Sequence, residues 1–233
     1  MKIFAISDLH LSFSSDKPMD IFGSMWENHF EQIREDWRLK VSDGDIVLLA
    51  GDLSWAMTWE NALIDIAEIE NLKGRKIIIR GNHDYWWQSY TKLASVLKEK
   101  GIYALQNNAI KMDGVIFCGT RGWTLPENNR SEEDEKIYRR ELIRLDLSLA
   151  EAKKLQTDNE PVTALFHYPP FELKNADTEF TALFEKYGVS RVVYGHLHGR
   201  GGRTDIRLEK NGVEYFMTSC DKLGNRLLEI ADL

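Results

Sequence analysis

The feature that most constrains this chain is a series of short apolar runs, each followed at once by aspartate, histidine or glycine. Several runs are almost entirely apolar and β-branched, which is typical of strands buried on both faces of a sheet. Longer amphipathic stretches separate them, so the pattern predicts an α/β fold. We expect strands over residues 2–7, 45–50, 76–80, 114–119, 162–167 and 191–195.

The stretches between these strands carry apolar residues at intervals of three and four, which predicts helices. At the start of the expected helix 132–156, Ser131 with Asp134 resembles a capping box, and a single apolar stripe follows along the helix. Such a stripe favours a surface helix packed on the domain. The alternative is a helical lid over residues 131–156 beside a ligand site. The expected helices cover about residues 23–40, 58–71, 88–100, 132–156 and 178–187.

The C-terminal part changes character. Arg203–Leu208 and Val213–Ser219 flank an Asn-Gly pair, which is a strong signal for a β-hairpin. Leu227–Ile230 is a candidate for the last strand. Because a hairpin is antiparallel and the earlier helix-separated strands are parallel, the sheets are predicted to be mixed.

Composition limits what the chain is expected to be. Its 233 residues suit one domain over residues 1–233, and 43% hydrophobic with 29% charged residues is ordinary for a soluble protein. A net charge of −7 argues against a duplex nucleic acid as partner. No apolar run has the length of a membrane span, and two cysteines make no disulfide framework. We therefore expect a cytoplasmic protein without a membrane partner. Its oligomeric state is left open.

Polar motifs follow five of the six predicted strands, at their carboxyl ends. In open α/β sheets this edge is where ligands bind, so we expect the motifs to lie close together. They are Asp8-Leu9-His10, Gly51-Asp52, Gly81-Asn82-His83-Asp84, His167, and Gly195-His196-Leu197-His198.

The residue types in these motifs indicate a metal site. Aspartate and amide oxygens together with imidazole nitrogens suit a borderline cation such as Mn, Fe or Zn. A lone histidine at a strand end is more often structural, but five of the six histidines lie in these motifs. Seven candidate ligands exceed the needs of one tetrahedral metal, so two divalent metal ions are predicted. The candidates are Asp8, His10, Asp52, Asn82, His167, His196 and His198.

With these five motifs in this order, the chain resembles the calcineurin-like metallophosphoesterase superfamily, and most of all its compact bacterial predicted phosphohydrolases. The resemblance spans Asp8 to His198. It implies a four-layer αββα sandwich with two mixed β-sheets. It also implies one metal held by Asp8, His10, Asp52 and His198. A second metal, sharing Asp52, would be held by Asp52, Asn82, His167 and His196.

The resemblance further implies catalytic roles for His83 and Asp84. His83 would contact the phosphate and protonate the leaving oxygen, and Asp84 would orient its imidazole. Two cations would lower the pKa of a bridging water, so that hydroxide attacks phosphorus. The expected activity is hydrolysis of a small-molecule phosphomonoester or phosphodiester. The alternatives are a cyclic-nucleotide or other nucleotide phosphodiesterase and a non-catalytic metal-binding scaffold.

Three departures narrow the resemblance. Protein Ser/Thr phosphatases of this superfamily continue the second motif with Asp-Arg-Gly, whereas Leu53-Ser54-Trp55 follows Asp52 here. This difference argues against a protein phosphatase. We also expect neither the second domain of the secreted nucleotidases nor the DNA-binding domains of the recombination nucleases. A nuclease that acts on single strands would fit the chemistry but not the acidic composition.

Substrate contacts are predicted only in outline. Arg121 and Trp123 follow a predicted strand and are candidates for lining the pocket. Arg200 and Arg203 would hold a second phosphate or a nucleotide, with a solvated loop as the alternative. Three tryptophans near the motifs would stack on a substrate ring or simply pack in the core, and these are Trp55, Trp86 and Trp87.

Overall fold

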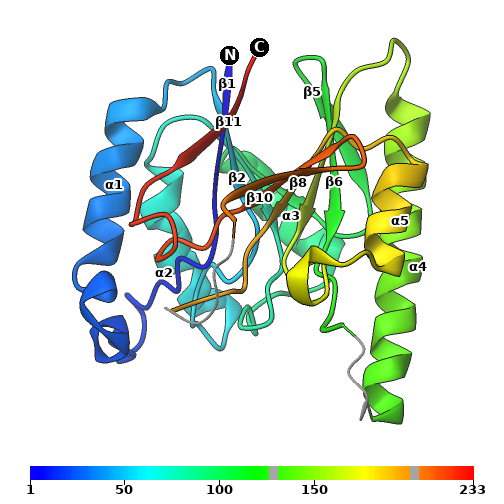
Figure 1. The fold of residues 1–233 in the computed structure, drawn as a ribbon. Helices are drawn as coiled ribbons and strands as arrows, with labels where there is room; N and C mark the ends of the chain where they lie inside the picture. Colours follow the sequence, from blue (N-terminus) through cyan, green and yellow to red (C-terminus); the bar gives the residue numbers. More distant parts are fainter. Residues whose placement is uncertain (126–130, 200–204) are drawn as a thin grey trace.

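Two β-sheets lie face to face, with helices outside each of them (Figure 1). This arrangement is seen in a computed structural model, which describes residues 1–125, 131–199 and 205–233. The predicted four-layer αββα sandwich with two mixed sheets is confirmed.

The first sheet has five strands in the order β11-β1-β2-β3-β4. The four N-terminal strands are parallel, and the C-terminal strand joins β1 antiparallel to it. The parallel strands therefore all end at the same edge. Their bounds are β1 (Lys2–Ile6), β2 (Ile46–Leu49), β3 (Arg75–Ile79), β4 (Ile102–Leu105) and β11 (Leu228–Asp232).

The second sheet has six strands in the order β5-β6-β7-β8-β10-β9. Its four central strands are parallel and its two edge strands are antiparallel. The predicted hairpin is present, because Asn211 and Gly212 join β9 to β10 with positive φ at both turn residues. The bounds are β5 (Ala109–Met112), β6 (Val115–Thr120), β7 (Val162–Phe166), β8 (Arg191–Tyr194), β9 (Arg207–Lys210) and β10 (Val213–Met217).

In the described part of the chain, five α-helices cover the outer faces of the sheets. The first three pack on the first sheet and the last two on the second. No helix in the described part of the chain is both long and apolar enough to cross a membrane. The helices are α1 (His29–Lys40), α2 (Trp59–Glu70), α3 (Tyr90–Glu99), α4 (Glu132–Leu155) and α5 (Glu179–Lys186), with short turns η1 (Met19–Phe22), η2 (Ser24–Trp26) and η3 (Leu173–Asn175).

Strand side chains alternate between two apolar layers, which is why the runs are apolar throughout. In β1, Ile3 faces the second sheet, whereas Phe4 faces the helices of the first. Phe117 and Leu165 meet Ile3 from the opposite sheet, and all three are fully buried. Burying a side chain of this size stabilises the fold by about 1.5–3 kcal/mol. This apolar layer holds the two sheets together and thus fixes the strand ends of both.

The expected elements differ from the structure in three places. Strands β4 and β5 were not predicted, and β5 is largely half-buried, so it lacks the continuous buried apolar run on which the prediction relied. The expected helix 23–40 is divided, since Asn28 has φ 51° and α1 begins after it. The expected strand Arg203–Leu208 instead runs over Arg207–Lys210, and residues 203–204 lie outside the described part.

Helix α4 packs lengthwise on the outer face of the second sheet, as a surface helix should. The Ser131 hydroxyl accepts a hydrogen bond from the Asp134 backbone N–H at 3.1 Å, which caps the first turn. Its N-terminal turns extend beyond the strands at the end where the strand-end motifs lie (Figure 1). The role of a lid stays a prediction.

Candidate metal centre

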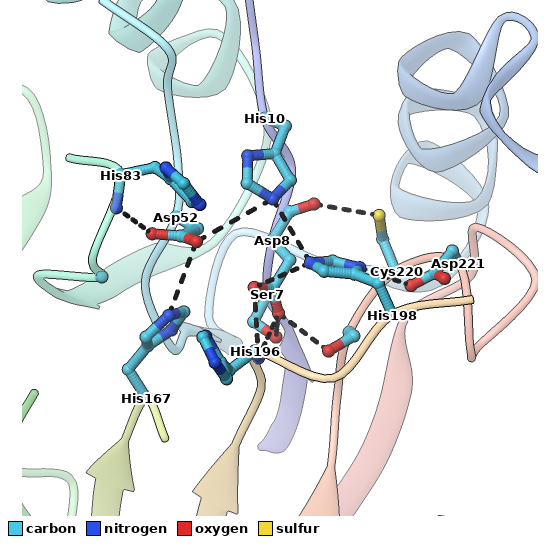
Figure 2. Close-up of polar contacts among 12 residues, drawn as sticks. Ser7, Asp8, His10, Asp52, His83, His167, His196, His198, Cys220 and Asp221 are labelled. Carbon is cyan, nitrogen blue, oxygen red and sulfur yellow. Dashed lines mark hydrogen bonds and ion pairs between the residues drawn. The ribbon is translucent and has the colours of Figure 1, made fainter. Parts of the chain in front are cut away.

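The loops after the parallel strands of both sheets meet at one edge and bring together the predicted ligands Asp8, His10, Asp52, His167, His196 and His198 (Figure 2). A first group consists of Asp8, His10 and His198, whose potential ligand atoms all lie within 4.8 Å of one another. His10 Nε2 lies 3.3 Å from His198 Nε2, and His198 Nε2 lies 3.4 Å from Asp8 Oδ1. Asp8 and His10 are buried, so this group forms the floor of the site.

A second group consists of Asp52, His167 and His196, within the same mutual distance. Asn82 joins it, since its Oδ1 lies 2.8 Å from His167 Nε2 and 2.9 Å from His196 Nδ1. Asp52 Oδ2 lies 3.5 Å from His167 Nε2 and 3.9 Å from His10 Nε2 of the first group. Asp52 is thus the carboxylate between the two groups, as the resemblance implies.

Four of these residues have a left-handed backbone conformation, which residues other than glycine rarely adopt. Asp8, His10, Asp52 and His196 have φ values of 59°, 46°, 52° and 72°. Left-handed backbone costs free energy and persists where the surroundings impose it, as at ligand sites. Each residue directly or closely follows a strand, so the chain turns sharply and points the side chain into the site.

Two glycines leave room for the central carboxylates. A β-carbon added at Gly81 would meet Asp52 Oδ1, and one at Gly195 would meet Asp8 Oδ2, both at less than 3.0 Å. Real β-carbons essentially never come that close. Each glycine directly precedes a predicted ligand. Because it has no side chain, a carboxylate that follows a different strand can pack against it.

Hydrogen bonds fix the Asp8 carboxylate. Its Oδ2 accepts from the Ser7 hydroxyl at 2.5 Å, the Ser219 hydroxyl at 2.9 Å and the His196 backbone N–H at 3.0 Å. Ser219 comes from the loop after β10, which also pairs with Ser7 in a β-bridge. These bonds hold Oδ2 in place and leave Oδ1 facing His198.

Asp221 also belongs to the site, although sequence reasoning missed it. Its Oδ1 lies 2.9 Å from His198 Nδ1, and its Oδ2 accepts from the Gly199 N–H at 2.8 Å. This contact directs His198 Nε2 toward Asp8. A carboxylate behind a ligating imidazole fixes its tautomer and orientation. Asp221 follows β10 by four residues, so the rule applied to the other strand ends would have found it.

The carboxylates and imidazoles shift one another's pKa values. Burial alone would lower the pKa of His167, but the Asp52 carboxylate more than offsets it and raises this pKa to about 9. Burial is likewise offset at His198, where hydrogen bonds to Asp221 and Asp8 raise the pKa to about 10. His10 lacks such a close partner, and burial lowers its pKa to about 4. Near neutral pH, His167 and His198 therefore hold protons that a cation must displace.

His83 lies at the mouth of the second group. Its backbone N–H donates to Asp52 Oδ1 at 2.8 Å, and its ring lies against Trp55 with centroids 4.4 Å apart. Its Nδ1 has no hydrogen-bond partner among the described residues. The backbone hydrogen bond and the contact with Trp55 therefore hold the imidazole beside Asp52.

Asp84 has a different role from the one expected. It is fully buried, and its carboxylate accepts hydrogen bonds from N–H groups of the loops that carry the ligands. No hydrogen bond joins it to the His83 ring within the described residues, so the expectation that it orients this imidazole is corrected. Its donors are the backbone N–H groups of Gly81, Asp52, Leu53 and Ser54 and the Trp86 indole. It ties the loop after β2 to the loop after β3.

Comparisons with known proteins show the family to which the chain belongs. The family model for calcineurin-like phosphoesterases matches residues 1–200, which is most of the chain. The chain is a member of the calcineurin-like phosphoesterase family. No curated protein matches it.

Two solved structures share the fold of this calcineurin-like phosphoesterase. The protein TT1561 of Thermus thermophilus is 14% identical with a TM-score of 0.59, and the match covers 98% of this chain and 97% of that one. A protein of unknown function, AQ665 from Aquifex aeolicus, is 14% identical with a TM-score of 0.50, covering 98% and 95%. At this identity the likeness extends to the fold alone.

The predicted aromatic contacts of this phosphoesterase fall into two classes. Trp86 and Trp87 are buried in the core between the first sheet and its helices. Trp55 stacks on His10 with centroids 4.8 Å apart, so it lines the site. Trp123 lies 5.5 Å from the Tyr168 ring, which in turn lies 4.3 Å from His196.

Of the three predicted arginines, the structure describes Arg121 alone. The Arg121 guanidinium covers the Trp123 ring at 4.7 Å, and its carbonyl accepts from the His167 N–H at 3.0 Å. Arg121 and Trp123 therefore flank the metal centre on the side of the second sheet. Arg200 and Arg203 lie outside the described residues.

Proposed function

We propose that this chain is a dinuclear metal-dependent phosphoesterase that hydrolyses a small-molecule phosphomonoester or phosphodiester. The observation that supports it is the pair of ligand groups that meet at Asp52. The family supplies the general chemistry, and the residues of this chain supply the details.

The donor groups fit two divalent cations. Nitrogens of His10 and His198 face each other at 3.3 Å, and Asn82 Oδ1 lies within 3.0 Å of two imidazole nitrogens. Such convergence of lone-pair donors with two buried carboxylates is what a borderline cation requires. The first cation would be held by Asp8, His10, Asp52 and His198, and the second by Asp52, Asn82, His167 and His196.

When bound, two divalent cations supply hydroxide near neutral pH and offset the charge on phosphate oxygens. The protein residues then position the ester. The backbone N–H of His83 is bonded to Asp52, which keeps the His83 ring at the second ligand group, where it would hold a phosphate oxygen and donate a proton to the leaving oxygen. Trp55 keeps that ring from rotating away.

The test is hydrolysis of p-nitrophenyl phosphate and of bis-p-nitrophenyl phosphate by the manganese-loaded chain, with metal content measured in the same sample. Hydrolysis of either ester, lost on chelation and restored by manganese, is expected. A chain that holds two metals and hydrolyses neither ester, nor any ester of a panel of nucleotides, cyclic nucleotides and sugar phosphates, would be a metal-binding scaffold instead.

A further inference from the structure

A cavity of about 200 Å³ lies at the carboxyl ends of β3, β4 and β6, and four arginines line it. They come from three parts of the fold: Arg80 follows β3, Arg121 follows β6, and two others project from α4. The remaining lining residues are neutral. The four arginines are Arg80, Arg121, Arg140 and Arg144, and we name this cavity the arginine pocket.

The single carboxylate of Glu141 does not neutralise the positive charge of the four arginines. Glu141 is fully buried, and Arg144 Nη1 pairs with its Oε1 at 2.6 Å. Arg121 and Arg140 come only to 3.8 Å and 3.9 Å, beyond hydrogen-bond distance. Arg80 has no ion pair within the described residues. Because a guanidinium keeps its charge at any ordinary pH, the pocket is strongly positive.

Two guanidiniums carry polar atoms that the protein leaves unsatisfied. The Nε atoms of Arg80 and Arg121 are buried and have no hydrogen-bond partner in the described part of the chain. Burial lowers the pKa of Arg121, and repulsion from Arg80 and Arg144 acts in the same direction. Crowding four cations around one carboxylate costs free energy, which a bound anion would offset.

Two of the pocket's arginines are close along the backbone to residues of the candidate metal centre. Arg80 directly precedes Gly81, which packs on the Asp52 carboxylate. The Arg121 carbonyl accepts hydrogen bonds from the backbone N–H groups of His167 and Tyr168. The arginine pocket and the candidate metal centre are therefore formed by neighbouring residues of the same strand ends.

We propose that the arginine pocket binds a second phosphate group of the substrate, so that the preferred substrates are esters with two phosphates. The inference rests on the proposed function. Planar guanidinium forks match phosphate oxygens, and several of them suit a dianion better than a single charge. The cavity is smaller than the roughly 300–1,000 Å³ of typical pockets for a whole ligand, so it suits one small group.

The kinetic test compares matched esters that differ by one phosphate, namely the monophosphates and bisphosphates of glycerol and of glucose. We expect the manganese-loaded chain to have at least a tenfold higher kcat/KM for a bisphosphate than for its monophosphate. Arg140→Gln should reduce that preference by about threefold to tenfold, mainly through KM. Arg140 is suitable because its side chain is 54% exposed and makes no close ion pair in the described part of the chain, so the fold does not depend on it.

Arg139→Gln is the matched control. Arg139 lies on the same helix with 58% of its side chain exposed, but it pairs with Glu135 and Glu179, away from the pocket. It should keep the preference of the unmodified chain. Equal preference in the unmodified chain, Arg140→Gln and Arg139→Gln would overturn the proposal, as would the absence of any preference for bisphosphates.

A binding test separates this proposal from the proposed function. Calorimetric titration of inorganic phosphate into the manganese-loaded chain should reveal a binding event that Arg140→Gln weakens by threefold or more and Arg139→Gln does not. If no ester is hydrolysed, this titration still decides whether the pocket binds phosphate. Phosphate binding that is the same in both variants would show that the pocket is not the phosphate site.

Discussion

Gly195 packs so closely against Asp8 that a β-carbon on this glycine would stand less than 3.0 Å from the Asp8 Oδ2 atom. The same Oδ2 accepts hydrogen bonds from Ser7 and Ser219, so the carboxylate has no free direction in which to move. The first metal group therefore depends on a missing side chain at the end of a strand in the other sheet.

Gly195→Ala should consequently displace Asp8. We expect a loss of about 1–3 kcal/mol in the free energy of unfolding, typical of an overpacked core, with manganese affinity reduced at least tenfold. Denaturant unfolding and metal titration measure the two effects. Gly44→Ala is the control, since a β-carbon there meets nothing within 4 Å and its φ is not in the left-handed range. Unaltered metal affinity in Gly195→Ala would show that the contact does not position Asp8.

Metal binding should release protons. In the metal-free chain the carboxylates raise the pKa of His167 to about 9 and that of His198 to about 10, so both imidazoles are protonated near neutral pH. A cation can bind only the neutral imidazole, so loading both groups should release about two protons per chain. Affinity should therefore increase with pH until these pKa values are passed. Calorimetry in buffers of different ionisation enthalpy counts the protons, and a count of zero would contradict the assignment.

Asp221→Asn should weaken the first metal group without unfolding the chain. The carboxylate that raises the pKa of His198 would be lost, while an amide oxygen could still accept from His198 Nδ1. Removing such a supporting partner typically costs about 10–100-fold in metal affinity. Metal titration measures the loss, and the proton count of the preceding experiment should fall in the same variant. Asp205→Asn serves as a control on an exposed carboxylate that makes no ion pair in the described part of the chain.

The sequence predicted the strand-end motifs because each follows a run of buried apolar residues, and the register of such a run fixes where it ends. Asp221 escaped because it follows β10 without a histidine or glycine beside it. Asp84 was misjudged because its position next to His83 suggested a pair, whereas its partners are backbone N–H groups of two separate loops. Such groups have no signature in the sequence.

The arginine pocket was not predicted from the sequence for a related reason. Arg121 was singled out from its strand end, but Arg140 and Arg144 lie on a helix rich in both charge signs, where a solvated face is the natural interpretation. Only the docking of α4 against β6 brings them to the end of β3. Contacts between elements far apart in the chain decide the function of these residues.

His83→Ala should reduce turnover while both metals stay bound. The ring supplies the nitrogen proposed to protonate the leaving oxygen, and general acid catalysis typically contributes about 10²–10⁴-fold. The hydrogen bond to Asp52 comes from the His83 backbone, so the substitution leaves it intact. Turnover of p-nitrophenyl phosphate and metal content should be measured on the same sample. Tyr85→Phe is the matched control, because Tyr85 is exposed and its ring lies 6.2 Å from His83. A turnover within twofold of the unmodified chain, with both metals present, would exclude His83 as the proton donor.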